Sequence, residues 1–393
     1  MTQHRLVIGF VPLLDCAPLV VAAEKGFAAA EGLELELVRE TSWANIRDRL
    51  IVGHFDAAHM LGPMPIASTL GIGHLKVPMI APMALNLGGN AITVSASLWS
   101  SMQRHGAYPG ADPIIQGAAL QRVVRERARA AAGPLSLAMV YPFSAHNYEL
   151  RYWLAASGID PEEDVLLSVI PPPLMVDALR SGQIDGFCSG EPWNSLAVAG
   201  GIGRIVTGTS AIWRQSPEKV IGMRAEWADN HMPETAALVR AVHRASLWCD
   251  AQESHSELAD LLAQPRFVGV SADIIERGVS GKMVFAPGSA PIEVPDFLAY
   301  ANGWATFPWA SHALWFYTQM VRWKQLTASD GAAAAARATY RPDLYRRALQ
   351  PLGLSLPSSD LKSEQPNAMG STETGFFDGK IFDPGDIDGY LKT

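Results

Sequence analysis

The stretch RLVIGFVPLLDCAPLVVAAEKGFAAAEGLELELVRETSWANIRDRLIVGHFDAAHML (residues 5–61) determines the class of fold that we predict. Its apolar periodicity predicts strand, helix, strand, helix and strand, in that order, at 5–13, 17–33, 33–40, 42–53 and 55–61. Ser42 is placed to cap the second of these helices. Strands that alternate with helices indicate a mostly parallel α/β sheet with right-handed crossovers.

The alternation continues past residue 61, pauses near residue 90 and then restarts. Further strands are predicted at 77–85, 91–97, 135–141, 164–170, 184–190, 203–211 and 219–224. A Gly- and Pro-containing polar stretch at 98–115 is predicted to be a loop, and the chain after residue 225 is mainly helical.

Two α/β lobes with more than one chain crossing predict a protein that closes around a ligand in a cleft. We expect the first part of lobe 1, lobe 2, a return to lobe 1 with C-terminal helices, and an extended tail at 1–90, 91–210, 211–360 and 361–393. The alternative at this level is a doubly wound enzyme with an all-helical C-terminal domain.

Composition and charge exclude some classes of function. The 393 residues are 48% hydrophobic and 18% charged, with a formal net charge of −8, so sizeable cores are expected. A mildly acidic protein is a poor candidate for direct binding to nucleic acid or to an anionic membrane. Cys16, Cys188 and Cys249 lie far apart and have no metal-binding spacing, so we expect buried free thiols.

The N-terminal residues indicate the cellular compartment in which we expect the protein. Only four residues precede the first predicted strand, which leaves no room for a secretory signal. No run of about 18 apolar residues free of charge appears later in the chain. If the sequence is the full gene product, we expect a cytoplasmic protein.

Catalytic signatures are missing from the sequence. There is no GxSxG elbow, no GxxxxGK[ST] loop and no HExxH motif. The stretch AGGIGRI (199–205) lacks the GxGxxG spacing and precedes a strand. Cys188 and His146 are conceivable as a nucleophile and its base, but Cys188 lies in an apolar strand pattern that favours an inert core residue. We therefore expect no enzymatic activity.

Polar residues at strand-to-helix junctions are more informative. Trp43 and His146 each stand at the start of a predicted helix that follows a strand, whereas Asn90 and Lys219 stand where the chain crosses between lobes. Ligands of α/β proteins bind at such junctions, and helix N-termini favour anions. Each residue taken alone also has an ordinary structural explanation. Together they supply hydrogen-bond donors and one cation, which suits a small anion.

Two further residues are expected to support this site without touching the ligand. Glu191 in GEPWN (190–194) ends a strand before a helix, where a carboxylate orients a neighbouring donor or caps the helix. His59 in AAHMLGPMP is interpreted as a strand-end histidine whose hydrogen bonds are satisfied within the protein.

At these residues the sequence resembles the nitrate/bicarbonate solute-binding family of the NrtA/CmpA type, a branch of the type II periplasmic-binding-protein fold. The resemblance covers about residues 5–225, and the tail FFDGKIFDPGDIDGYL is also similar. It is carried by SWANIRDRLIVGHFDAAHMLGPMP, MALNLGGNAITVS, MVYPFSAHNYELRYWLAASGI, PPPLMVDALRSGQIDGFCSGEPWN and SPEKVIGM. It implies two α/β lobes around a ligand cleft, with C-terminal helices.

The resemblance also implies a set of ligand contacts. In nitrate-binding members a tryptophan, a glutamine, a histidine and a lysine hold the anion, and these positions fall on Trp43, Asn90, His146 and Lys219. Asn90 keeps the amide donor but is one methylene shorter than glutamine, so the contact is direct, through water or lost. Bicarbonate-binding relatives are expected to carry an acidic residue at the lysine position, working with calcium. Lys219 therefore predicts nitrate, with nitrite as the alternative, and neither a metal nor a cofactor.

The role of the protein is the last expectation from the sequence. Cytoplasmic relatives of the NasS type are nitrate sensors, and the resemblance implies that such a sensor holds an RNA-binding ANTAR-type antiterminator (NasT) inactive until nitrate binds. Release of this partner then allows transcription of nitrate-assimilation genes. The alternatives are a substrate-binding component of a nitrate ABC transporter and an enzyme of the pyrimidine-precursor branch that reuses the fold. The enzyme needs a nucleophile or base that these residues do not assemble.

Overall fold

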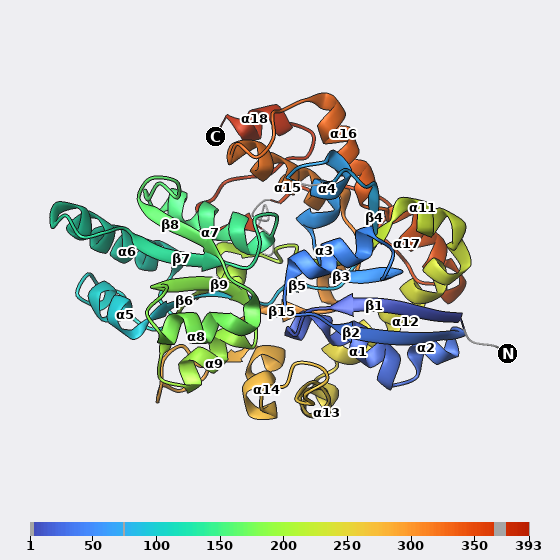
Figure 1. Ribbon diagram of the computed structural model, residues 1–393, viewed down its shortest axis with the longest axis horizontal. Coiled ribbons are helices and arrows are strands. Elements are labelled where there is room, and N and C mark those ends of the chain that lie inside the picture. The colour runs from blue at the N-terminus through green and yellow to red at the C-terminus, as the bar shows by residue number, and fades with distance from the viewer. Residues whose placement is uncertain (1–3, 74, 365–374, 393) are drawn as a thin grey trace.

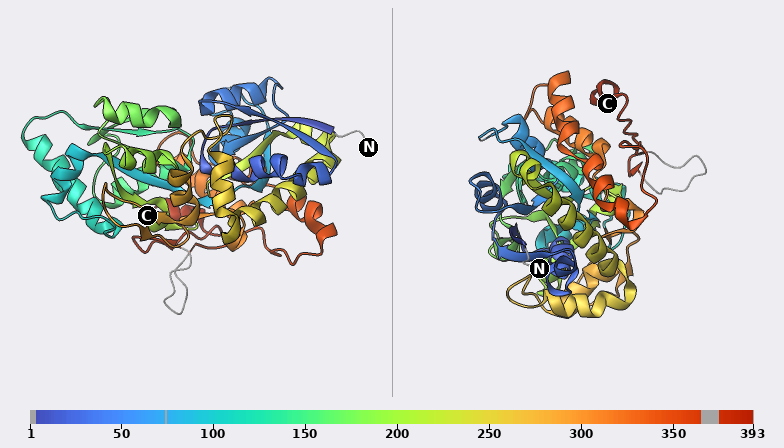
Figure 2. Two further views of the ribbon diagram at one scale, coloured as in Figure 1. Left: turned by 90° about the horizontal axis from the view of Figure 1, so that it is seen from below. Right: turned by 90° about the vertical axis from the view of Figure 1, so that its right-hand side faces the viewer.

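Two five-stranded sheets lie side by side in the computed structural model, which describes residues 4–73, 75–364 and 375–392. Helices flank each sheet, and the two sheets stay apart in Figure 1 and in the left-hand view of Figure 2. The sheet of lobe 1 contains, in strand order, β2 (Leu33–Arg39), β1 (His4–Phe10), β3 (Ala57–Leu61), β12 (Lys219–Arg224) and β4 (Met79–Ala84). The sheet of lobe 2 contains β10 (Gly203–Gly208), β6 (Asn90–Ser95), β9 (Gly186–Gly190), β7 (Leu135–Met139) and β8 (Val165–Val169).

Both sheets are mixed, so the expectation of a mostly parallel sheet is wrong in part. The strands β12 and β6 each run antiparallel to both of their neighbours, whereas β1, β2 and β3 pair in parallel, as do β7, β8 and β9. The physical reason is the chain crossing. The strands β6 and β12 begin at the edge where the lobes meet, whereas the parallel strands end there.

Helices cover the faces of both sheets. Those of lobe 1 before the first crossing are α1 (Ala17–Glu24), α2 (Phe27–Ala30), α3 (Trp43–Ile51) and α4 (Pro63–Leu70). Those of lobe 2 are α5 (Ala96–Gln103), α6 (Pro113–Arg129), α7 (Ala145–Ala156), α8 (Met175–Arg180), α9 (Trp193–Ala199) and α10 (Thr209–Ile212).

Several predicted segments differ from the structure. The strand expected at 203–211 ends at Gly208, where α10 follows, and α18 lies in the tail that was expected to be extended. The helix expected at 17–33 is broken at Gly26, whose φ of 79° is a left-handed conformation that glycine adopts at low cost. The loop expected at 98–115 contains most of α5. Ser95 caps this helix by accepting a hydrogen bond from the backbone N–H of Leu98 at 3.2 Å, and a short apolar stripe holds it against the sheet.

The C-terminal part returns to lobe 1 and then extends along both lobes. Its helices are α11 (Ala225–Asn230), α12 (Met232–Asp250), α13 (His255–Leu262), α14 (Ala272–Ser280), α15 (Ala310–Arg322), α16 (Asp330–Thr339), α17 (Pro342–Leu349) and α18 (Ile387–Leu391). Short antiparallel pairs join β5 (Leu87–Gly88) to β15 (Leu298–Ala299), β11 (Trp213–Arg214) to β16 (Gly375–Phe376), and β13 (Lys282–Met283) to β14 (Ile292–Glu293). Figure 1 places α15, α16 and α18 together above the two sheets.

An aromatic cluster fixes the end of the chain. The ring of Phe376 lies 4.8 Å from that of Trp213, 5.0 Å from that of Tyr152 and 6.0 Å from that of Trp315, measured between centroids. Tyr152 belongs to α7 of lobe 2 and Trp315 to α15, so this segment joins lobe 2 to the C-terminal helices.

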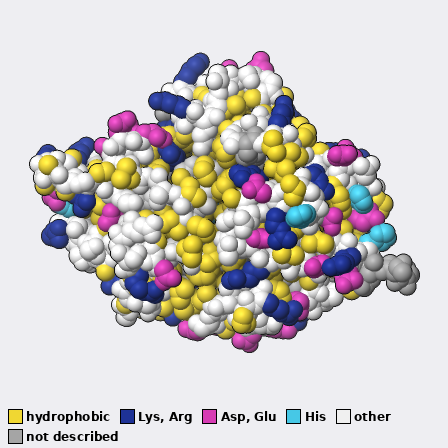
Figure 3. Space-filling model, in the orientation of Figure 1, with side chains coloured by type: hydrophobic (Ala, Val, Ile, Leu, Met, Phe, Trp, Pro, Cys, Tyr) yellow, Lys and Arg dark blue, Asp and Glu magenta, His cyan; other side chains and the backbone are white. Residues whose placement is uncertain are grey.

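The surface agrees with the charge of the chain. Basic and acidic side chains are interspersed over the face in Figure 3. Among the described residues, no helix combines the length and the apolar character that a membrane crossing requires.

Candidate functional site

The edge where the lobes meet is built from strand ends, strand starts and helix N-termini. Trp43 is the first residue of α3, and Ser42 caps this helix by accepting from the backbone N–H of Asn45 at 3.2 Å, as predicted. His146 is the second residue of α7, which Ser144 caps in the same way with a bond of 3.0 Å from Asn147. The two helices therefore direct their N-terminal ends toward this edge, where free N–H groups favour negative charge.

The residues singled out from the sequence come together here. Asn90 begins β6 and Lys219 begins β12, and all four side chains, including those of Trp43 and His146, are 0% exposed. The Lys219 ammonium lies 5.5 Å from the centre of the Trp43 ring, an arrangement that stabilises a buried cation. Side chains separated by more than a hundred positions thus form one buried cluster.

Two carboxylates hold the ammonium of Lys219. Its Nζ lies 2.7 Å from Asp15 Oδ2 and also donates to Glu218 Oε2. Burial alone would lower the pKa of Lys219, but these two carboxylates raise it above its ordinary value. The pKa of Asp15 is well below its ordinary value because Lys219 and His59 outweigh the effect of burial. Lys219 is therefore a permanent cation in this cluster.

His59 contacts Asp15. Its Nε2 lies 2.9 Å from Asp15 Oδ1, and its Nδ1 accepts a hydrogen bond from the backbone N–H of Val11 at 3.4 Å. Accepting through Nδ1 fixes the neutral tautomer that carries its proton on Nε2. Burial also lowers the pKa of His59. The ring packs edge-on against Trp43 at 5.1 Å.

Asn90 is turned toward carboxylates. Its Nδ2 donates to Glu218 Oε1 at 2.8 Å and to Glu149 Oε2 at 3.4 Å, while its Oδ1 has no partner among the described residues. Burial raises the pKa of Glu149 to about 8, and neighbouring Glu218 adds to this effect. In this arrangement the amide of Asn90 links two acidic side chains.

Polar atoms of Trp43 and His146 are left without partners. Within the described part of the chain, the indole Nε1 of Trp43 and Nε2 of His146 make no hydrogen bond, whereas His146 Nδ1 lies 3.3 Å from Glu218 Oε1. Burial lowers the pKa of His146 well below its usual value, and nearby Lys219 lowers it further, so the ring is neutral. A buried polar group without a partner costs about 1–3 kcal/mol. An acceptor-rich anion bound here would satisfy such donors.

Glu191 lies at the contact between the lobes but away from the ammonium. Its Oε2 accepts from the backbone N–H of Ser195 at 3.2 Å, which caps α9, and burial raises its pKa to about 7. Its backbone carbonyl accepts from the N–H of Leu14 in lobe 1 at 2.9 Å. The structure therefore gives Glu191 a capping role.

Further hydrogen bonds cross between the lobes. The indole of Trp193 in lobe 2 donates to the carbonyl of Pro12 in lobe 1 at 3.1 Å. Arg47 of α3 donates to the hydroxyl of Tyr141 in lobe 2 at 2.6 Å. The lobes are thus closed on each other around the buried cluster.

Sequence reasoning missed the three carboxylates of the cluster, although a signal for each was present. Asp15 lies shortly after the first strand, Glu218 precedes Lys219 in SPEKVIGM, and Glu149 lies three residues after His146 on the same helix face. Cys188 is fully buried, and burial raises its pKa well above the usual value, so it is no nucleophile.

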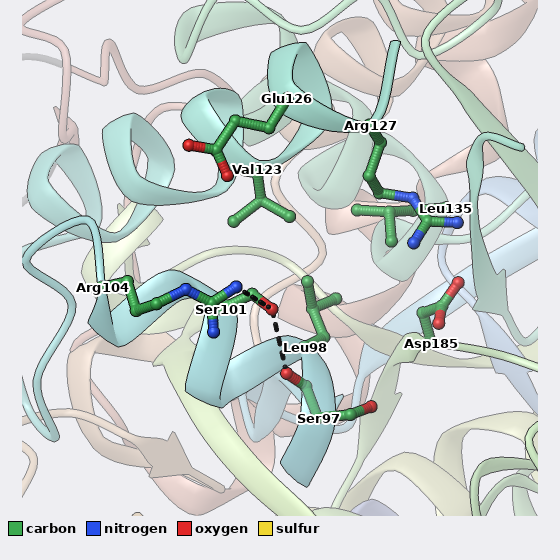
Figure 4. Close-up of a pocket in the computed structure, with 9 residues that line it drawn as sticks. All are labelled: Ser97, Leu98, Ser101, Arg104, Val123, Glu126, Arg127, Leu135 and Asp185. Carbon is green, nitrogen blue, oxygen red and sulfur yellow. Dashed lines mark hydrogen bonds between the residues drawn. The ribbon is translucent and has the colours of Figure 1, made fainter. Parts of the chain in front are cut away.

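Surface pockets lie elsewhere. One of about 280 Å³ between α5 and α6 is shown in Figure 4. Its Arg104 donates to Ser101 Oγ at 3.1 Å, and its Arg127 is bound to the carbonyl of Gly133. Leu135 and Asp185 place it at the opposite strand ends from the buried cluster. In the described ranges, no group of three or more His, Cys, Asp or Glu side chains is arranged to hold a metal ion.

Comparisons with known proteins identify a family and several related proteins. A family model described as NMT1-like matches residues 2–263. The chain is 37% identical over 397 residues to the nitrate import ATP-binding protein NrtC of Synechocystis sp., covering all of this chain but only 55%, about half, of NrtC. It is 35% identical over 396 residues to the nitrate/nitrite binding protein NrtA of Synechococcus elongatus, covering 98% of this chain and 85% of that protein.

A solved structure of an NrtA protein is similar to this chain over its full length. The crystal structure of the periplasmic nitrate-binding protein NrtA from Synechocystis PCC 6803 superposes with a TM-score of 0.90 at 32% identity, covering 100% of this chain and 98% of that one. The type II periplasmic-binding-protein fold expected from the sequence is thereby confirmed. NrtA is a solute-binding protein, not an enzyme.

Proposed function

Because this chain belongs to the NMT1-like family of NrtA- and CmpA-type binding proteins, we propose that it binds nitrate or nitrite between its two lobes. One observation carries the proposal. The buried ammonium of Lys219 lies near the unpartnered Nε1 of Trp43 and Nε2 of His146, where the two lobes meet. A monovalent anion with several acceptor oxygens matches these groups in charge and in hydrogen bonding.

The roles proposed for single residues follow from this geometry. Lys219 supplies the countercharge, Trp43 an indole N–H and His146 a ring N–H. Asn90 completes the set by holding Glu218 in place, and it reaches the anion only if its amide turns away from the carboxylates. His59 and Glu191 support the site through Asp15 and through the cap of α9. Planar anions are held well by donors directed from several sides.

Isothermal titration calorimetry with nitrate, nitrite, bicarbonate and sulfate tests this proposal. We expect heat with nitrate or nitrite, and loss of that heat in Lys219→Ala and in a Trp43→Phe/His146→Gln double variant. The matched control is Lys25→Ala, because Lys25 pairs with Glu257 at the surface. An unchanged titration in Lys219→Ala would refute the assignment of the site.

For the biological role, we propose a cytoplasmic sensor that restrains an ANTAR-type antiterminator until the anion binds. The similarity to NrtC relates the chain to nitrate handling, since a related unit forms about half of a protein named for ATP binding in nitrate import. Anion-dependent closure of two lobes is a two-state element that can alter a partner surface. The test is co-purification with an ANTAR-domain antiterminator. Nitrate at saturating concentration should dissociate the complex. A complex that persists in nitrate would contradict the proposed sensor role.

The second candidate is the substrate-binding component of a nitrate transporter. It is favoured by the similarity to NrtA, most of whose length the chain spans. Restoration of nitrate uptake in cells that lack their own binding protein would support it, as would recovery of the natural protein from outside the cytoplasm.

A further inference from the structure

The charges of the buried cluster do not balance for an anion site. One ammonium, that of Lys219, faces two carboxylates, Asp15 and Glu218. A third carboxyl group, Glu149, lies next to Glu218 through their shared hydrogen-bond donor, Asn90. With Lys219, Asp15 and Glu218 ionised, the cluster already carries a net negative charge before any anion arrives. All of these side chains are almost completely buried.

The surroundings of Glu218 supply no second cation. The titratable groups that face it from neighbouring elements are Asp15 after β1, His146 and Glu149 on α7, Cys188 on β9, Lys219 on β12, and Tyr340 after α16. Burial raises the pKa of Cys188 and of Tyr340, so both stay neutral. His59, beyond Asp15, is fixed as a neutral tautomer by the N–H of Val11. Of the described residues in this set, Lys219 alone is positively charged.

We propose that this protein takes up a proton when it binds its anion, and that Glu218 and His146 share that proton. The inference rests on the proposed function, since it concerns the anion bound at the same cluster. Glu218 Oε1 lies 3.3 Å from His146 Nδ1, so a proton placed on either atom forms a bond between the two side chains. Glu218 thereby becomes a positioning residue, which acts on the anion through Lys219 and His146.

The energetic argument concerns the countercharge of Lys219. An ammonium has three N–H donors, and Asp15 and Glu218 accept from two of them, which leaves one for the anion. Adding a second negative charge to a sealed cluster that is already negative is strongly unfavourable, because water is absent and like charges repel. A proton on the Glu218–His146 pair cancels the excess charge and lets Lys219 compensate the anion.

Two further observations agree with this step. Asn90 Oδ1 has no partner within the described residues, and the Nδ2 of the same amide donates to Glu218 Oε1, so turning the amide over gives a protonated Glu218 an acceptor. Burial raises the pKa of Glu218 above that of an ordinary glutamate, against the opposing effect of Lys219. Nitrate itself does not titrate near neutral pH, so any proton taken up must bind the protein.

Calorimetry with nitrate measures the number of protons that the protein takes up on binding. The heat of binding is recorded at one pH in buffers of different ionisation enthalpy, and its dependence on that enthalpy gives the number of protons taken up. We expect about one proton per nitrate, and a Kd that falls as pH decreases, by up to about tenfold per pH unit. A proton number of zero with a constant Kd would overturn the proposal.

Variants locate the proton. Glu218→Gln should bind nitrate without proton uptake and with a Kd independent of pH. The control is Glu364→Gln, a fully buried glutamate that contacts Trp213, His312 and Lys362, and it should leave the proton number unchanged. Proton uptake that persists in Glu218→Gln would place the proton elsewhere and contradict the proposal. If this variant fails to fold, the proton number of the unaltered protein decides alone.

The two proposals fail in different ways. Absence of any heat with nitrate or nitrite, at every pH, would refute the proposed function. Heat without proton uptake would leave that function in place and refute only the coupling.

Discussion

Replacing Lys219 with methionine tests the charge balance of the cluster without any ligand. Methionine keeps much of the length and apolar character of the lysine stem, whereas the charge is lost. In the unaltered protein the ammonium lies 2.7 Å from Asp15 Oδ2 and bonds Glu218, and all three side chains are nearly inaccessible to solvent. At an effective dielectric constant of about 20, charges about 3 Å apart attract by about 5 kcal/mol. Removing one partner of a buried pair costs about 3–5 kcal/mol.

The cost should depend on pH, and its sign follows from the pKa of Asp15. In the unaltered protein this pKa is depressed, so its contribution to stability is present above the unfolded value near 3.8 and is lost only in stronger acid. Without the ammonium, burial raises the pKa of both Asp15 and Glu218. The variant then regains stability as pH falls from 8 toward 5, at up to about 1.4 kcal/mol per pH unit for each carboxyl group.

Urea denaturation at pH 8 and pH 5.5 measures this difference. We expect Lys219→Met to lose about 3–5 kcal/mol at pH 8 and at most half of that at pH 5.5. The control is Lys25→Met, because Lys25 and Glu257 form a partly exposed ion pair that should contribute about 0–1 kcal/mol at either pH. An equal loss for Lys219→Met at both pH values would show that the two carboxylates do not depend on the ammonium, and the electrostatic reasoning would be wrong.

Three further predictions address the indole, the third carboxyl group and the tail. Trp43→Phe should raise the Kd for nitrate ten- to a hundredfold by calorimetry, because a hydrogen bond to a charged group contributes about 1.5–3 kcal/mol, whereas Trp99→Phe in α5 should not. Glu149 has a folded pKa of about 8 against 4.5 unfolded, so its contribution to stability is complete below pH 4.5 and is lost as pH rises toward 8. Glu149→Gln should therefore gain up to about 4 kcal/mol relative to the unaltered protein between pH 5 and pH 8 in urea titrations, and a constant difference would contradict this. Phe376→Ala should make the C-terminal segment sensitive to limited proteolysis, because truncating a buried aromatic ring costs about 3–5 kcal/mol, whereas exposed Ile381→Ala should not.

The sequence predicted most strands because burial and alternation leave local marks. The strand starts near residues 135, 165 and 203 fall within one residue of those expected. The sequence did not predict strand direction. The strands β6 and β12 run antiparallel to their neighbours because the chain enters each of them directly after it crosses between the lobes. It also missed α5, whose apolar stripe is short and whose other residues are mostly serine and glutamine. Such elements are defined by tertiary packing more than by local pattern.

The candidate site shows the same division between local and tertiary information. Trp43 and His146 were placed at helix N-termini from neighbouring residues alone, since each follows a predicted strand and Ser42 offers a cap before Trp43. Asp15 and Glu218 were not predicted from the sequence, because carboxylates repel an anion and are therefore not expected beside a proposed anion site. The structure explains their presence, since an ammonium as deeply buried as that of Lys219 needs counterions. In the proposed coupling, Glu218 shares with His146 the proton that is taken up with the anion, while Asp15 stays ionised. The charges that stabilise the buried ammonium of Lys219 are therefore also the charges on which the proposed pH dependence of nitrate binding rests.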